Sequence, residues 1–289
     1  MIGEKVMSSL RKRVTITIRE DLLHGLDRLV DRERIRNRSH AIEFLLSRSL
    51  QSKPTQAVIL ASGEGVNMRP FTYEVPKPLI PVGGRPLLEH TLALLREAGL
   101  THLIITVSHL AEKVEQHFSD GQKFGVHITY AHESKPSGTG GALLAARKHL
   151  SNNPFVVLYG DVLVKLDVND LLKTHRETKA AISTIAVTSV ADPSAFGAVK
   201  LRGTRVVEFS EKPSTSADTS RLVFAGVAAL SPSVFSFFPK RHRAGLSLED
   251  DIFPKLISEG RLFAYPFEGE WFDVSTPEIY ERVLQQWKG

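Results

Sequence analysis

The 289-residue sequence contains no cysteine, which excludes disulfide bonds, thiolate zinc sites, iron–sulfur clusters and cysteine nucleophiles. Any metal must therefore bind oxygen or imidazole ligands, and the eleven histidines show no metal-binding spacing. Long apolar runs are also missing. No stretch of about eighteen apolar residues occurs, and residues 1–10 hold no apolar signal core. We therefore expect no membrane span and a cytoplasmic location.

The formal net charge of +5 is unevenly distributed along the chain. Residues 1–53 hold 12 Lys and Arg against 7 Asp and Glu, whereas 25 residues of each sign lie beyond. This asymmetry favours a nucleic acid or another anionic surface as a partner of the N-terminal part, although a merely solvated basic segment is the alternative. A short polar connection with a proline, residues 51–56, predicts two domains, 1–53 and 54–289.

The N-terminal part shows a strand pattern followed by two helical patterns. Residues 11–19 alternate strictly, with apolar side chains on one face and Arg or Thr on the other, which predicts a half-buried strand. A first amphipathic helix of about a dozen residues is predicted from Glu20, because leucines recur at helical spacing. A second is predicted to end at Leu50, with Ser39 as its N-cap.

One strand and two short helices leave the strand edges unpaired, so a partner chain is needed. Residues 11–50 resemble the ribbon-helix-helix DNA-binding family, to which the MetJ and Arc repressors belong. The resemblance implies a homodimer or higher even oligomer whose paired strands enter the major groove of double-stranded DNA. By position, Arg13, Thr15 and Thr17 would read bases and Ser39 would hold a phosphate. A dimerisation ribbon that never touches DNA is the alternative.

In the larger part, strand patterns alternate with helical patterns, which predicts an α/β domain with a mostly parallel sheet. The expected strands are 57–60, 102–107, 127–131 and 154–158, the expected helices are 86–98, 110–118, 140–149 and 168–176, and a closing amphipathic helix is expected at 278–287. Ligands of such sheets bind beyond the carboxyl ends of the strands. The turn at 61–70 lies there, and Gly63 and Gly65 let backbone N–H groups approach an anion.

A series of further motifs follows this glycine loop in a fixed order. They are Pro76-Lys77-Pro78, Gly138-Thr139-Gly140-Gly141, Gly160-Asp161, Glu211-Lys212-Pro213 and the run from Trp271 to Glu278. This order resembles the sugar-1-phosphate nucleotidyltransferases over residues 56–288. The resemblance implies a Rossmann-like, glycosyltransferase-A-like domain. It also implies a reaction that joins a nucleoside triphosphate to a sugar 1-phosphate and releases pyrophosphate, chiefly by positioning and charge neutralisation.

The resemblance assigns roles to residues by their position in these motifs. Two carboxylates would hold Mg²⁺, and three residues would serve catalysis. A wider set would contact the nucleotide and the sugar. The metal residues are Asp161 and Asp273; the catalytic residues are Lys77, Arg69 and Asp161; the nucleotide and sugar residues are Gly63, Gly65, Asn67, Gly138, Gly141, Gly197, Glu211 and Lys212.

The sequence departs from the family pattern in both binding regions. The family loop usually reads Gly-x-Gly-Thr-Arg-Leu-Arg-Pro, and here Val66 and Asn67 replace the Thr and the first Arg. An arginine at that position lies against the triphosphate, and its loss costs rate; Arg69 remains as a candidate to compensate. Phe224 stands where the family commonly has an Asn that bonds sugar hydroxyls, so the sugar site is either remodelled or shut.

These departures leave it open whether the chain is an enzyme, and they favour binding over turnover. The first hypothesis is a DNA-binding transcriptional regulator whose nucleotidyltransferase-like domain binds a nucleotide or nucleotide sugar as effector. The second is an active Mg²⁺-dependent sugar-1-phosphate nucleotidyltransferase with an added DNA-binding module. A third makes the N-terminal part only an oligomerisation device on an enzyme.

Overall fold

The computed structural model describes residues 14–31, 33, 35–50, 56–213, 220–239 and 245–288, apart from the side chains of residues 46–50. The chain divides into two compact units, Met1–Lys53 and Pro54–Gly289. Each unit has helices or strands of its own. In the part of the chain that is described, no helix is long and apolar enough to cross a membrane.

The N-terminal unit contains two helices, α1 (Glu20–Leu29) and α2 (Arg38–Leu50). Leu26 and Ala41 are buried where the two helices pack together. Asn37 caps α2, because its Oδ1 atom accepts a hydrogen bond from the backbone N–H of His40 at 2.9 Å. The prediction that Ser39 is the cap is therefore wrong by two residues, and Ser39 lies in the first turn of the helix instead.

Residues 14–19, which belong to the predicted strand 11–19, form no strand among the described residues. Val14 and Ile16 are 76% and 54% exposed. A strand needs a neighbour for its backbone hydrogen bonds, and none of the described residues of this unit pairs with residues 14–19. Residues 11–13, including Arg13, lie outside the described residues.

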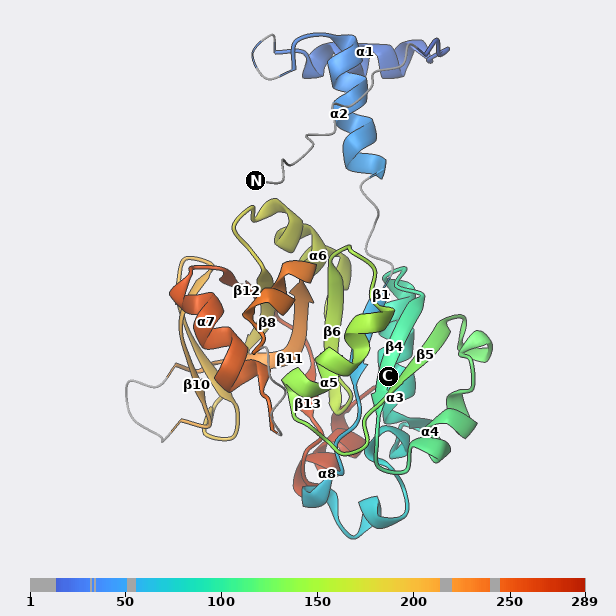
Figure 1. Ribbon diagram of the computed structural model, residues 1–289, viewed down its shortest axis with the longest axis vertical. Coiled ribbons are helices and arrows are strands. Elements are labelled where there is room, and N and C mark those ends of the chain that lie inside the picture. The colour runs from blue at the N-terminus through green and yellow to red at the C-terminus, as the bar shows by residue number, and fades with distance from the viewer. Residues whose placement is uncertain are drawn as a thin grey trace, which may run out of the picture. The chain divides into compact units, whose positions relative to one another are not determined.

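The larger unit is built on a nine-stranded sheet with the order β5-β4-β1-β6-β11-β8-β12-β10-β9 (Figure 1). Its strands are β1 (Gln56–Leu60), β4 (His102–Val107), β5 (His127–His132), β6 (Phe155–Tyr159), β8 (Ser183–Ser189), β9 (Gly197–Arg202), β10 (Arg205–Glu211), β11 (Leu222–Leu230) and β12 (Leu262–Pro266). Strands β5, β4, β1 and β6 are parallel, as the alternation predicts. Strand β11 is antiparallel to both of its main neighbours, β6 and β8, while β12 is again parallel to β8. The predicted α/β class is confirmed.

Helices cover both faces of this sheet because alternate side chains of its strands point to opposite sides. The helices are α3 (Leu87–Glu97), α4 (Ala111–Phe118), α5 (Thr139–Ala146), α6 (Val168–Glu177), α7 (Phe253–Ser258) and α8 (Pro277–Gln286). Ala57 and Ile59 of β1 share one apolar core with α3, α4 and α6. Val58 between them shares the other core with α5 and α7. The predicted helix ranges agree with those observed, except that α5 ends at Ala146 and a 3-10 turn continues it.

Short elements at the edges of the sheet complete the unit. A two-stranded ribbon pairs β7 (Val162–Val164) with β13 (Trp271–Asp273), and another pairs β2 (Pro81–Val82) with β3 (Arg85–Pro86). The 3-10 turns are η1 (Val66–Met68), η2 (Phe71–Tyr73), η3 (Lys77–Leu79), η4 (Gln122–Phe124), η5 (Arg147–His149) and η6 (Pro232–Phe237), and η7 (Leu248–Ile252) is a π-helix. The β7–β13 ribbon joins segments that lie far apart in the sequence, with Asp161 directly before β7 and Asp273 as the last residue of β13.

Candidate functional site

A first cavity of about 250 Å³ lies at the carboxyl ends of β1 and β6. Its lining includes the glycine loop after β1, the Lys77-Pro78 segment, the turn that begins α5 and the end of β6. The lining residues are Leu60, Ala61, Ser62, Gly63, Gly65, Lys77, Pro78, Pro136, Gly138, Thr139, Ala142, Tyr159, Gly160 and Asp161. Motifs up to about one hundred residues apart in the sequence thus meet in one cavity.

A second cavity of about 210 Å³ shares Tyr159 with the first. Its lining combines charged side chains with an aromatic wall. The residues are Tyr159, Val162, Ala195, Phe196, Gly197, Glu211, Lys212, Phe224, Gly226, Glu249, Trp271 and Asp273. The residues that the sequence assigned to the sugar side therefore gather here, together with the second proposed metal carboxylate.

Two aspartates lie near each other between these cavities. The backbone N–H of Val274 donates to the carbonyl of Asp161 at 2.9 Å, and Asp273 pairs with Val162 in the β7–β13 ribbon. The Lys77 ammonium group lies 2.7 Å from the Asp161 carboxylate. The Oδ1 atom of Asp273 is buried and has no hydrogen-bond partner among the described residues. Burial, with the charge of Asp161, raises the pKa of Asp273 to about 7.

An orphaned carboxylate oxygen beside a second carboxylate fits a divalent cation. In the described residues, no group of three or more His, Asp or Glu side chains could hold a metal. Two protein carboxylates suit Mg²⁺, which usually keeps several waters and takes its other ligands from substrate phosphates. Asp161 and Asp273 are therefore sufficient as a protein contribution to a magnesium site of that kind.

Two glycines are required by the backbone of the first cavity. Gly65 has a φ of +64°, and a Cβ atom there would lie 2.9 Å from the side chain of Thr72. Gly138 has a φ of +87°, and its Cβ would lie 2.3 Å from the carbonyl oxygen of Leu246. The turn at Gly138 is thus pressed against the chain that precedes η7. Gly141 forms part of α5 but is not among the residues that line either cavity.

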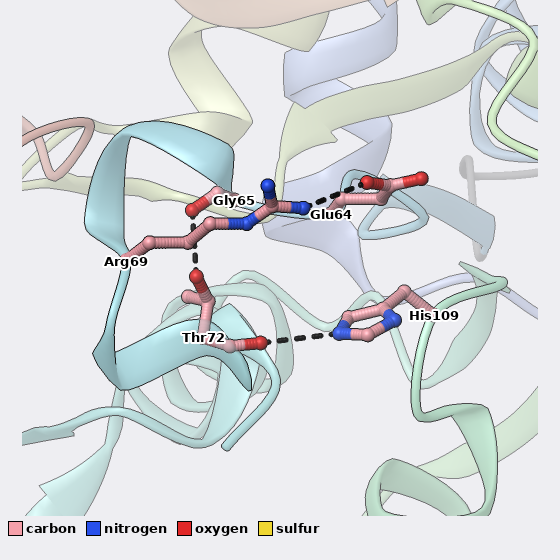
Figure 2. A network of polar contacts seen from close by, with 5 residues as sticks. All are labelled: Glu64, Gly65, Arg69, Thr72 and His109. Atoms are coloured by element: carbon pink, nitrogen blue, oxygen red, sulfur yellow. Dashed lines mark hydrogen bonds and ion pairs between the residues drawn. The ribbon is translucent and has the colours of Figure 1, made fainter. Parts of the chain in front are cut away.

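The glycine loop folds back on itself (Figure 2). The hydroxyl of Thr72 donates to the carbonyl of Gly65 at 2.7 Å, and Nε2 of His109 lies 3.1 Å from the carbonyl oxygen of Thr72. The guanidinium group of Arg69 points to Glu64, with 3.3 Å between Nη2 and Oε2. The contact with Glu64 therefore sets the position of the Arg69 guanidinium group.

Neither Arg69 nor the two substituted loop residues, Val66 and Asn67, line either of the two cavities described above. The Arg69 guanidinium also lies over the Tyr73 ring, 5.1 Å from its centroid, and the side chain is 42% exposed. Asn67 is exposed, and Val66 is 52% exposed. The structure therefore does not bring Arg69 or Asn67 together with Lys77 and Asp161, although the sequence grouped all four.

A carboxylate that sequence reasoning missed connects the two cavities. Glu249, in η7, accepts hydrogen bonds from the hydroxyls of Thr139 and Ser247, both at 2.7 Å, and from the hydroxyl of Tyr159. Burial and the Glu249 charge raise the pKa of Tyr159 well above its ordinary value, so Tyr159 remains a donor. The only sequence signal was Ser247 before an acidic run, a helix-cap pattern.

Aromatic side chains form one wall of the second cavity. The rings of Phe196 and Trp271 lie 5.0 Å apart, and those of Tyr159 and Phe224 lie 5.5 Å apart. Phe224 is 8% exposed and enters the lining, as expected from its place in the sequence. Phe224 does not fill this space, because the cavity that it lines has a volume of about 210 Å³.

On the N-terminal unit, the described candidate DNA contacts are accessible. Thr15 and Thr17 are exposed in the segment that precedes α1, and Ser39 is exposed in the first turn of α2. Backbone N–H groups of a helical first turn have no intrahelical acceptors, so they can bind an anion.

Two family models match the chain. The nucleotidyl transferase model matches residues 56–288, and the ribbon-helix-helix model of the CopG family matches residues 12–50. Both resemblances seen in the sequence are confirmed.

Curated relatives of the larger unit carry out nucleotidyl transfer to sugar phosphates, by their names. A UTP–glucose-1-phosphate uridylyltransferase of Synechocystis sp. is 35% identical over 244 residues, or 79% of this chain and 62% of that protein. The catalytic subunit beta of a Danio rerio mannose-1-phosphate guanylyltransferase is 36% identical over 230 residues, or 78% of this chain. The match spans 62% of the length of each of these relatives.

Solved structures have the same fold. A Bacillus anthracis protein assigned as a glucose-1-phosphate thymidylyltransferase, solved with a sucrose, matches with a TM-score of 0.74 and 26% identity. The match covers 80% of this chain and 94% of that one. HddC from Yersinia pseudotuberculosis, complexed with GMP-PN, matches with a TM-score of 0.68 over 81% of this chain and all of its own, at 24% identity.

Proposed function

Since the chain belongs to the nucleotidyl transferase family over residues 56–288 and carries a ribbon-helix-helix module at 12–50, we propose that it is a DNA-binding transcriptional regulator. Its larger unit binds a nucleotide or nucleotide sugar as effector. The relatives, which by their names handle uridylyl and guanylyl groups with sugar phosphates, support this ligand class.

One observation favours binding over turnover: the guanidinium group of Arg69, in the glycine loop, contacts Glu64. Asn67 supplies no charge, and Arg69 pairs with Glu64 outside both cavities as the structure describes them. Loss of one group that stabilises transition-state charge costs about 100- to 1,000-fold in rate. Ground-state binding is affected less, because the backbone N–H groups of the loop, Lys77 and the two aspartates are retained.

Asp161 and Asp273 would hold Mg²⁺ with the effector, and the ion would neutralise phosphate charge between them. The orphaned Oδ1 atom of Asp273 supports this assignment. Lys77 would stay near the phosphates through its contact with Asp161. Gly63, Gly65 and Gly138 would allow backbone to approach the nucleotide, and Glu211 and Lys212 would contact its sugar phosphate.

The N-terminal unit would act as half of a homodimer. The exposure of Val14 and Ile16 supports this, because pairing with the same segment of a second chain would cover them. In the dimer, Arg13, Thr15 and Thr17 would contact base edges in the major groove, and Ser39 with its helix N-terminus would contact a phosphate. The effector can change DNA affinity only if it binds the DNA-competent dimer with a different affinity.

The DNA-binding part is tested by selecting duplexes from a random library with the full-length protein at moderate salt. Arg13→Ala and Thr15→Ala are expected to weaken binding to the selected sequence by on the order of 10-fold each and to relax base preference. Arg96→Ala, on the surface of the larger unit, is the matched loss of one charge. No duplex binding, or unchanged binding in Arg13→Ala and Thr15→Ala, would contradict the proposal.

The effector part is tested by thermal unfolding with a panel of nucleotides and nucleotide sugars, each with and without Mg²⁺. A ligand that binds the folded state raises the melting temperature whether or not turnover occurs. The stabilising ligand is then expected to shift the DNA-binding curve. A panel that stabilises nothing would remove the effector from the proposal.

A second candidate function is supported by the intact contact between Lys77 and Asp161 beside Asp273. These three residues would serve an active Mg²⁺-dependent sugar-1-phosphate nucleotidyltransferase. Pyrophosphate release with nucleoside triphosphates and sugar 1-phosphates tests it, and Asp161→Ala should abolish a real signal. Robust turnover without DNA binding would select an enzyme whose N-terminal module only oligomerises.

A further inference from the structure

Phe224 is a rigid part of the second cavity. Its ring contacts Tyr159, Phe253 and Phe209, with centroid separations of 5.5, 5.6 and 6.4 Å. Side chains locked by several ring contacts do not rotate away to admit a polar group. Strand β11 holds the backbone of Phe224 opposite Val187 of β8. A ligand in this cavity must therefore accept a fixed apolar surface.

The polar groups nearest this wall are already used by the protein. The indole N–H of Trp271 donates to the carbonyl of Ala225 at 3.0 Å, and the hydroxyl of Tyr159 is bound to Glu249. Both carboxylate oxygens of Glu249 accept hydrogen bonds, one from Tyr159 and the other from Thr139 and Ser247. The aromatic wall thus presents ring surfaces and no spare donor among the described residues.

The remaining polar lining is charged. Glu211 lies opposite Gly197 where β10 pairs with β9, Lys212 follows it, and Asp273 comes from β13. These groups can bind a phosphate, a metal-bound oxygen or hydroxyls. The cavity therefore has a charged part and an apolar part. A ligand that fits it should have charged or polar groups at one end and an apolar surface at the other.

We propose that the second cavity binds a sugar phosphate that lacks a hydroxyl, or carries a methyl group, where it meets Phe224, and that Phe224 sets this preference. The proposal rests on the proposed function in taking the cavity for a sugar-phosphate site, and it names the class of sugar. A hydroxyl placed on the Phe224 ring would lose its bonds to water and gain none. Discrimination on the order of 10-fold is expected from one such group.

The test is a binding titration on the full-length protein with glucose 1-phosphate and its monodeoxy forms, each lacking one hydroxyl. Calorimetry is run with Mg²⁺, with and without the best nucleotide of the effector panel. At least one deoxy form is expected to bind on the order of 10-fold more tightly than the parent sugar phosphate. Equal affinities, a uniform preference for the parent, or no binding of any member would overturn the proposal.

Variants at position 224 identify the residue responsible. Phe224→Asn is expected to reverse the preference by supplying hydrogen bonds, whereas Phe224→Leu, which stays apolar, should keep it. If Phe224→Asn does not fold, the wild-type panel and Phe224→Leu still decide, because a preference lost in Phe224→Leu contradicts the assignment to an apolar surface. If both variants fold and keep the wild-type ratio, Phe224 does not set it.

The nucleotide arm separates this proposal from the proposed function. Binding of a nucleotide without any sugar preference would leave the effector site in place and remove only the role of Phe224. A deoxy preference with no nucleotide binding would retain the inference about the second cavity and contradict the nucleotide effector.

Discussion

The ammonium group of Lys77 lies 2.7 Å from the carboxylate of Asp161, across 84 residues of sequence. The Lys77 side chain is 12% exposed, so this ion pair is shielded from water more than a surface pair would be. Lys77 neutralises one carboxylate of the aspartate pair and leaves Asp273 without a partner for its Oδ1 atom among the described residues. The imbalance makes Asp273 the group whose charge is most costly in this site.

Asp273→Asn is therefore expected to stabilise the metal-free protein at pH 8. The folded-state pKa of Asp273, about 7, lies above its usual value of 3.8, so the folded state binds a proton more tightly than the unfolded state. The charged Asp273 side chain consequently destabilises the folded state most above pH 7. This destabilisation declines as the pH falls towards 4, because the side chain becomes protonated. Urea unfolding with a chelator at pH 8 should show a gain of about 2–4 kcal/mol. A less stable Asp273→Asn protein at pH 8 would contradict this.

Mg²⁺ should stabilise the wild-type protein but not Asp273→Asn, and so remove the stability advantage of the variant. The ion displaces the proton from Asp273, so its affinity should fall by up to about tenfold for each pH unit below 7. Calorimetric titration of Mg²⁺ between pH 6 and 8 measures the slope. A pH-independent affinity would show that Asp273 does not bind the ion.

Asn67→Arg together with Val66→Thr is expected to raise turnover by restoring a cation that Glu64 does not hold. Pyrophosphate release with Mg²⁺, a nucleoside triphosphate and a sugar 1-phosphate should increase by on the order of 100-fold. Asn67→Gln with Val66→Thr is the uncharged control. If both double variants are equally fast, or the wild-type chain is already as fast as the arginine variant, the loop charge is not what limits the rate.

Glu249→Ala should weaken nucleotide binding and stability together. It leaves the hydroxyls of Tyr159, Thr139 and Ser247 without their acceptor, at a cost of about 2–4 kcal/mol in the free energy of unfolding. Glu249→Gln keeps one acceptor oxygen and should lose less. Denaturant unfolding and nucleotide titrations of both variants measure this. Equal losses in the two variants would show that the carboxylate has no special role.

His175 is expected to make the larger unit sensitive to acid. Burial lowers the pKa of His175 to about 4, while its ring nitrogens lie 2.9 and 3.0 Å from the hydroxyls of Thr184 and Ser231. The unfolded chain binds the proton of His175 more tightly than the folded chain does. The contribution of neutral His175 to folding stability is therefore complete above pH 6.5 and is lost as the pH falls towards 4. The loss should reach about 3 kcal/mol. His175→Gln should show less of this decline in unfolding at pH 5 and pH 7; identical declines would contradict the assignment.

Periodicity predicted the parallel half of the sheet to within one residue, because its strands are short apolar runs between strong helical patterns. Periodicity could not predict β7 and β13, since a strand of three residues is too short to show an alternating pattern. The pairing of these two strands nevertheless places Asp161 near Asp273. Ser39 and Asn37 are both good N-cap residues, and only the hydrogen bond to His40 distinguishes them.

The candidate site was predictable where a motif carries its own backbone geometry. Lys77, Gly138 and Asp161 meet in the first cavity because each follows a strand or opens a helix at the same edge of the sheet. The direction of Arg69 was not predictable, since a flexible side chain follows local partners such as Glu64. Glu249 was missed because its contact with Tyr159 spans 90 residues without a motif.

The exposed apolar side chains of Val14 and Ile16 imply that DNA binding depends on the cellular concentration of the protein. If paired ribbons are the DNA-binding form, the amount of that form at low abundance grows with the square of the chain concentration. Halving the supply of the protein would then reduce operator occupancy about fourfold, so its synthesis rate would be a regulatory input alongside any small molecule.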